Sequence, residues 1–162
     1  MAILSPASLL GCAAVAVAAG TALQPVAVLE IENAAVGSRA RIPLWDGGRF
    51  SVVAQHSMYD QPVTEEFAVD AERRIVLEAV SSPSAAVREY FGISAAGERH
   101  AMQRPMAEIV FRVAAGTPQK LRIGSAERSF LELGAHGDRL VMRGAQTSAL
   151  AEWLTHLRRI AP

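Results

Sequence analysis

At 162 residues the chain is long enough for one domain with a hydrophobic core and too short for two. Lysine plus arginine equals aspartate plus glutamate, at 16 each, so no net charge would attract nucleic acid, and nucleic-acid binding is disfavoured. Hydrophobic residues make up 51% of the chain. Many of them are alanines and valines near the start, which indicates a targeting segment.

Residues 1–24 are expected to be a signal peptide or a membrane anchor, followed by a single extracytoplasmic domain over residues 25–162. No charged side chain precedes Glu30, and residues 9–23 are almost wholly apolar. A helix over residues 3–23 is long enough to cross a bilayer, whereas Ala16 and Ala18 match the small-residue pattern that a signal peptidase reads. Leu-Leu-Gly-Cys at 9–12 also has the form of a lipoprotein box. We therefore expect a protein at the inner membrane facing the periplasm, or a periplasmic protein after cleavage.

The sequence predicts neither a metal site nor a cofactor. Cys12 is the only cysteine and lies in the leading segment, so the following domain has no thiol or disulfide. The four histidines are scattered, and none has the spacing of a zinc motif. His100, Met102 and Met106 could together attract a soft copper ion, but methionines in such a segment more often serve packing.

After Pro25 we expect an all-β domain, mainly an antiparallel sandwich or small barrel. Short β-rich runs recur about every ten residues, and Asp46-Gly47-Gly48 favours a tight hairpin turn. Apolar and polar residues alternate within the runs, so that Ile75 and Leu77 face one way and Glu78 the other. The expected strands cover residues 26–32, 38–44, 49–56, 62–69, 74–80, 107–113, 120–124, 128–133 and 139–143.

Two helices are expected inside this domain, in addition to the N-terminal apolar helix. Ser82, Pro83 and Gly92 stand where a cap, a first-turn proline and a terminal glycine belong, which predicts a short helix over residues 83–91. Apolar residues at helical spacing behind Thr147 and Ser148 predict a C-terminal amphipathic helix over 148–160. That helix is expected either to cover an open end of the β domain or to dock on a membrane or a partner.

Candidate site residues gather at the predicted hairpin between residues 49–56 and 62–69. Even positions of the first strand and odd positions of the second are mainly apolar and should face one core. That arrangement predicts a register of His56 with Val63 and Ala54 with Glu65, with residues 57–62 as the loop. His56 and Glu65 would then be diagonal neighbours within reach of each other, and Ser57 would hydrogen-bond the loop backbone.

The expected His56–Glu65 contact has three interpretations: a structural clasp, a ligand-recognition site that includes Ser57, and a hydrolase site. The hydrolase is the weakest, because Ser57 follows His56 on an extended backbone and points to the opposite face. No G-x-S-x-G motif is present. In the long loop expected over 92–106, Arg99 and Arg104 are candidates for binding a small anion, although a solvated charged loop explains them as well.

The spacing His56-Ser57, Pro62-Val63, Glu65 and Phe67, followed by the run at 74–80, resembles the bacterial family known as domain of unknown function 1850. The similarity extends over about residues 25–143 and includes the turn Gly47-Gly48-Arg49-Phe50. The resemblance implies a small protein with an N-terminal apolar segment and an extracytoplasmic β domain. Such proteins are often encoded beside tripartite transporters that use a TAXI-type solute receptor. Residues 82–92 and the terminal helix depart from the family's pattern, and no catalytic residue carries over.

These observations lead to two functional hypotheses. The first is a non-enzymatic extracytoplasmic accessory domain that assists a TRAP/TAXI-type transporter, with the transporter membrane subunit or the solute-binding protein as its partner. The second is a small-ligand-binding or esterase-like protein with a pocket at the His56–Glu65 end.

Overall fold

The computed structural model describes residues 24–152 and residue 154 of this protein. The chain divides into two compact units, one formed by residues 27–145 and the other by the two chain ends, residues 1–26 and 146–162. The predicted N-terminal helix, like the signal or anchor segment, lies outside the described residues apart from Gln24.

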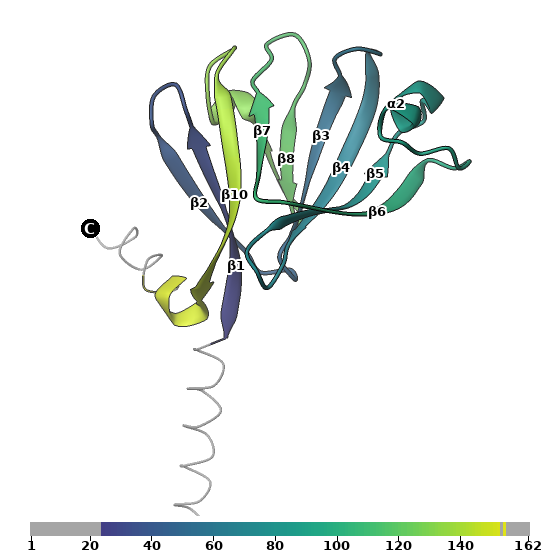
Figure 1. Ribbon diagram of the computed structural model, residues 1–162. Helices are drawn as coiled ribbons and strands as arrows, with labels where there is room; N and C mark the ends of the chain where they lie inside the picture. The colour runs from purple at the N-terminus through teal and green to yellow at the C-terminus, as the bar shows by residue number, and fades with distance from the viewer. Residues whose placement is uncertain (1–23, 153, 155–162) are drawn as a thin grey trace, which may run out of the picture. The chain divides into compact units, whose positions relative to one another are not determined.

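The described residues form mainly antiparallel β-sheet, as the sequence predicts (Figure 1). The elements are, in chain order, β1 (Pro25–Asn33), β2 (Arg39–Leu44), β3 (Arg49–His56), β4 (Gln61–Val69), β5 (Ile75–Ser81), α2 (Ala85–Tyr90), β6 (Arg99–Met106), β7 (Glu108–Arg112), β8 (Lys120–Ile123), β9 (Ala126–Ser129), the 3₁₀ helix η1 (Phe130–Glu132) and β10 (Arg139–Ser148).

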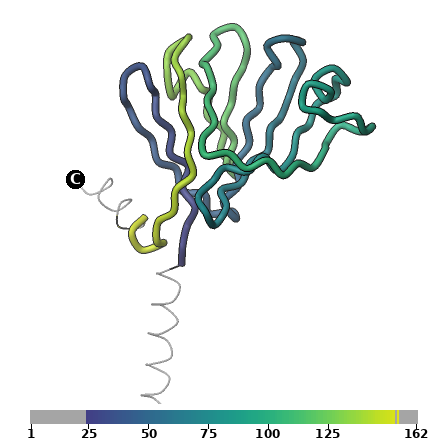
Figure 2. Tube along the Cα trace, in the orientation of Figure 1, coloured from purple at the N-terminus to yellow at the C-terminus, as the bar shows by residue number. Residues whose placement is uncertain are grey.

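The strands form two sheets that share one hydrophobic core. One sheet has the order β2-β1-β10-β7 and the other the order β6-β5-β4-β3-β8-β9. The chain passes from the edge of the second sheet to the edge of the first between β6 and β7, which only Ala107 separates (Figure 1). Figure 2 traces the hairpins of both sheets along the chain. Buried side chains come from both sheets and include Leu29, Ile31, Leu140 and Met142 from the first and Val52, Phe67, Ile75, Val80 and Leu121 from the second.

Glycines are required at a turn and at a close backbone contact around this core. Gly47 and Gly48 form the predicted turn between β2 and β3 with φ of 61° and 76°, a region that favours glycine. Gly144 of β10 lies against the β4–β5 turn, where a Cβ atom would stand 2.6 Å from the carbonyl oxygen of Arg73 and 2.8 Å from Cγ1 of Val69. The four-stranded sheet can therefore approach this turn only because residue 144 has no side chain.

The prediction of a long loop over residues 92–106 was wrong, because residues 99–106 form the edge strand β6. β6 pairs only with β5, and most of its side chains are exposed, so the apolar alternation that marks a half-buried strand is missing. The strand predicted over 128–133 was also wrong in part. It ends at Ser129, whose side chain accepts from Leu131 while Glu132 accepts from the Ser129 backbone, a capping box that starts η1.

The short helix predicted over 83–91 is confirmed as α2, but its cap is Ser84 and not Ser82. The Ser84 hydroxyl accepts from the backbone of Val87, whereas the buried Ser82 hydroxyl donates to the carbonyl of Pro62 and ties α2 to β4. In the unit formed by the chain ends, residues 149–152 and 154 are helical, and Ser148 accepts from Ala151 at their start, as expected of a cap. The rest of the predicted C-terminal helix lies outside the described residues. No helix in the described part of the chain has the length and apolarity that a membrane crossing requires.

Candidate functional site

The predicted pairing of β3 with β4 was wrong by two residues. His56 lies opposite Gln61, Ala54 opposite Val63 and Val52 opposite Glu65. The turn needs only residues 57–60, because Asp60 adopts a left-handed φ of 51° and the backbone amides of Tyr59 and Asp60 both donate to the His56 carbonyl. β4 therefore begins at Gln61.

This register separates His56 from Glu65, so the predicted contact between them does not form. Glu65 lies opposite Val52, four residues along β3 from His56, or about 13 Å at the usual rise of a strand. Ser57 is exposed, and among the described residues its side chain makes no hydrogen bond, so its predicted bond to the loop was wrong. The geometry that supported a pocket or a hydrolase site at this pair is absent.

His56 belongs instead to a cluster of aromatic rings at one end of β3. Its ring stacks on Tyr59, with centroids 5.2 Å apart, and meets the edge of Tyr90 at 4.6 Å and of Phe91 at 6.4 Å. The Met58 backbone amide donates to Nδ1 of His56 at 3.4 Å, which leaves the proton of the neutral ring on Nε2. The β3–β4 turn and the end of α2 are thus joined through one imidazole.

Much of this cluster is open to solvent. The exposed fractions are 68% for Met58, 59% for Tyr90 and 37% for Tyr59. Phe91 is half-buried and packs against the core, in which Val87 of α2 is fully buried. We call His56, Met58, Tyr59, Tyr90 and Phe91 the aromatic end patch. In this patch the His56 imidazole is held in place by its contacts, and Tyr59 and Tyr90 keep exposed ring surface.

The sequence prediction missed most of this patch. It included His56 among the candidate residues and gave Met58, Tyr59, Tyr90 and Phe91 no role in a site. The signal that could have found the patch is a tyrosine at the tip of a tight hairpin and a Tyr-Phe pair directly before Gly92, which ends α2 with a φ of 79°. An aromatic side chain in the last turn of so short a helix can bury only part of its surface against the core.

Glu65 faces inward, as predicted, but without the expected partner. It lies opposite the buried Val52 on β3 and the buried Val80 on β5. His100 follows on β6 opposite Val80, and its Nε2–H donates to the carbonyl of Gly97 and not to the carboxyl. Burial raises the pKa of Glu65 from 4.5 to about 7. Among the described residues no ion pair or hydrogen bond holds this carboxyl.

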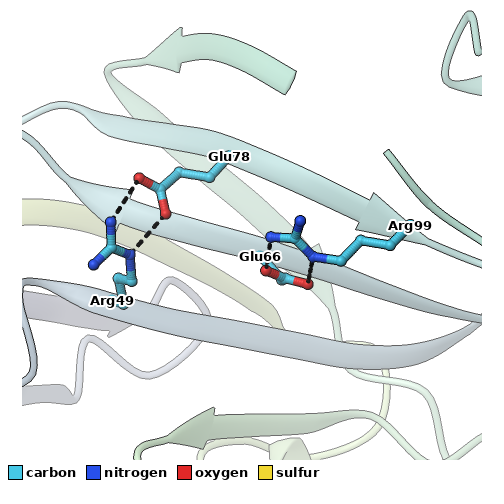
Figure 3. Close-up of polar contacts among 4 residues, drawn as sticks. All are labelled: Arg49, Glu66, Glu78 and Arg99. Carbon is cyan, nitrogen blue, oxygen red and sulfur yellow. Dashed lines mark hydrogen bonds and ion pairs between the residues drawn. The ribbon is translucent and has the colours of Figure 1, made fainter. Parts of the chain in front are cut away.

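The other two predicted site residues lie on β6 and do not meet (Figure 3 shows Arg99). Arg99 donates from Nε and Nη2 to both oxygens of Glu66, at 2.8 and 2.7 Å, and this pairing lowers the pKa of Glu66. Arg49 and Glu78 form a similar pair on the same outer face of the six-stranded sheet (Figure 3). Arg104 lies opposite Leu77 and makes no ion pair within the described residues. Arg99 is therefore already paired with a carboxylate, whereas Arg104 has no carboxylate partner among the described residues.

Within residues 24–152 and 154, no cluster of three or more histidine, cysteine, aspartate or glutamate side chains is arranged to hold a metal ion. No protein-family model matches the chain, and no curated protein or solved structure is significantly similar to it. The family resemblance of the sequence therefore stays a prediction, and the aromatic end patch is the best-defined candidate site.

Proposed function

We propose that this protein is a non-enzymatic binding domain that presents the aromatic end patch to a protein partner. We take its two sheets as an antiparallel sandwich that serves as a rigid support for the patch. The observation that carries the proposal is the contact of the His56 ring with both Tyr59, face to face, and Tyr90, in a T-shaped arrangement, while both tyrosines stay exposed. Exposed apolar surface of this kind is typical of an interaction site.

The physical properties of the patch favour a protein partner over a small molecule. Tyrosine supplies a large contact area at a low cost in side-chain entropy, and it is enriched at the centres of protein interfaces. Small ligands are usually bound in concave sites. A cavity of about 300 Å³ lies next to α2 and is lined by Ala85, Arg88, Glu89 and residues 92–95, and the rings of His56, Tyr59 and Tyr90 are not part of its lining.

The proposed partner is a subunit of a TRAP/TAXI-type transporter, either its membrane subunit or its solute-binding protein. This assignment follows the family resemblance of the sequence and its apolar first 24 residues, which favour a site of action at the periplasmic face of the inner membrane. The paired charges on the outer face of the six-stranded sheet, such as Arg49 with Glu78 and Arg99 with Glu66, leave little field to attract a partner there. Contact through the aromatic end patch is therefore a more favourable way to bind the partner than contact through these charges.

Affinity capture with the full chain as bait, from gently solubilised membranes of the source cell, tests the proposal. The wild-type chain should recover transporter subunits, and Tyr90→Ala should recover at least about tenfold less, since truncating a central interface tyrosine costs 2 kcal/mol or more. Trp45→Ala is the matched control, because Trp45 is 61% exposed and follows β2 directly, in the turn that leads to the start of β3, whereas His56 ends that strand. Equal recovery by all three chains, or no transporter subunit with any of them, would contradict the proposal.

A further inference from the structure

The outer face of the four-stranded sheet carries an excess of positive charge. Arg139 and Arg143 of β10 and Glu108 and Arg112 of β7 are exposed on the outer face, because the alternate residues Leu140, Met142 and Ile109 are buried in the core. The charged residues of the four strands are five arginines and three glutamates: Arg39, Arg41, Arg112, Arg139 and Arg143, and Glu30, Glu32 and Glu108. Two positive charges are left over.

All three glutamates are occupied by the other arginines. Glu30 pairs with Arg41 at 3.1 Å, Glu32 with Arg39 at 3.5 Å and with Arg143 at 3.2 Å, and Glu108 with Arg143 at 2.7 Å. Neither Arg112 nor Arg139 makes an ion pair within the described residues. The excess charge of the face is therefore held by these two side chains.

Arg112 and Arg139 lie directly opposite each other in the β7–β10 ladder. Directly opposed side chains have Cβ atoms about 4.5–5.5 Å apart, and like charges in this position destabilise a sheet. Four residues along β10 the same ladder opposes Arg143 to Glu108, a complementary pair. Nη1 of Arg112 donates to the carbonyl of Gly137 at 3.4 Å, which restrains this guanidinium near the start of β10. Both arginines are exposed and able to meet a ligand.

We propose that Arg112 and Arg139 form a binding site for a phosphate group. Guanidinium groups bind oxyanions through two parallel N–H···O bonds, and two of them offer such forks from adjacent strands. A phosphate monoester carries between one and two negative charges at neutral pH and so matches two cations better than a single carboxylate does. Its binding removes the like-charge repulsion in the ladder. This site is on a different sheet from His56 and is independent of the function proposed above.

Thermal unfolding of the full chain, in inorganic phosphate and in sodium chloride of equal ionic strength, tests the site. Phosphate at ten times its Kd should raise the Tm of the wild-type chain by about 3 to 5 °C relative to chloride. Arg112→Gln and Arg139→Gln should each weaken phosphate binding at least about tenfold and lose most of that rise. Arg104→Gln should keep the rise, because Arg104 lies opposite Leu77 and lacks a second arginine. An equal phosphate effect in all four chains, or none in the wild type, overturns the proposal.

The phosphate group could belong to a free compound or to a lipid headgroup, and one further measurement separates these sources. The Nε–H signals of Arg112 and Arg139 can be followed by NMR with the full chain in phosphatidylcholine nanodiscs, with and without phosphatidylglycerol. A shift on adding inorganic phosphate assigns a free ligand, and a shift that requires phosphatidylglycerol assigns a headgroup. If neither addition shifts the two signals, or if Arg104 shifts as much, the site does not exist.

Discussion

Val52 lies directly opposite Glu65 in the β3–β4 ladder, so a carboxyl group faces the apolar interior of the domain. Val80 flanks Glu65 on β5, and the nearest titratable group in that row is His100 on β6, which is engaged with Gly97. Burial without a cationic partner raises the pKa of Glu65 to about 7. The domain thus contains an acid that titrates close to neutral pH.

The folded state should accordingly lose stability as the pH rises from about 4.5 to 7. Glu65 binds a proton more tightly in the folded chain than in the unfolded chain, so folding takes up protons within this window. A pKa of about 7 against 4.5 corresponds to at most about 3 kcal/mol, and less is expected because part of the side chain is exposed. Glu65→Gln should remove the dependence and be more stable than wild type at pH 7.5. Urea unfolding at a series of pH values measures the effect.

Glu66→Gln is the matched control, because the neighbouring carboxyl faces outward and its pKa is lowered by Arg99. Its contribution should be present above pH 4.5 and be lost as the pH falls below that value, the opposite sign to Glu65. A wild-type profile that is flat between pH 4.5 and 7, or one that Glu65→Gln leaves unchanged, would show that the carboxyl is solvated.

A methyl group at position 144 should destabilise the domain. The Cβ of Gly144→Ala would meet the Arg73 carbonyl at 2.6 Å, and a backbone atom cannot move away as a flexible side chain can. Overpacking of this kind costs about 1–3 kcal/mol. Gly116→Ala is the control, since nothing lies within 4 Å of its Cβ and it should change stability by less than about 1 kcal/mol. Equal unfolding midpoints for the two variants would mean that β10 does not lie this close to the β4–β5 turn.

Asn33 should be needed to hold the loop that leads into β10. Its buried amide donates to Oδ2 of Asp138 at 2.7 Å and to the Leu133 carbonyl, and its Oδ1 accepts from the backbone of Ala35. Asn33→Ala removes these three hydrogen bonds, although Asp138 keeps the Ala135 amide as a donor, and should cost about 1–3 kcal/mol in unfolding free energy. Amide hydrogen exchange should quicken at residues 133–138 and stay unchanged in the β4–β5 hairpin. Uniform quickening across the domain would contradict a local role.

The sequence predicted the elements whose signal is local and apolar. β3 has the predicted bounds of 49–56, because its even positions are apolar and Gly47 and Gly48 mark its start. The sequence analysis did not predict β6, because an edge strand that pairs on one side only can expose most of its side chains. The start of η1 at Ser129 with Glu132 was readable as a capping box but was overridden by the β-rich run before it.

The candidate site was harder to predict, because its geometry depends on a single turn. The left-handed backbone at Asp60 shortens the β3–β4 loop and shifts the register by two residues, which preserves the inward faces and changes every neighbour. Glu65 was correctly expected to face inward, while its partnership with His56 was wrong. The ring contacts of His56 with Tyr90 and Phe91 join residues more than thirty positions apart, and no local pattern reports them.

Site-specific photocrosslinking tests most directly whether the aromatic end patch binds a transporter subunit. A benzoylphenylalanine placed at position 90 in the full chain, and irradiated in intact cells, should form a covalent adduct with a transporter membrane subunit or solute-binding protein. The same probe at position 45, an exposed aromatic position in the turn between β2 and β3, should form little or none. Adducts of equal yield at both positions, or no adduct with a transporter subunit at position 90, would contradict the account.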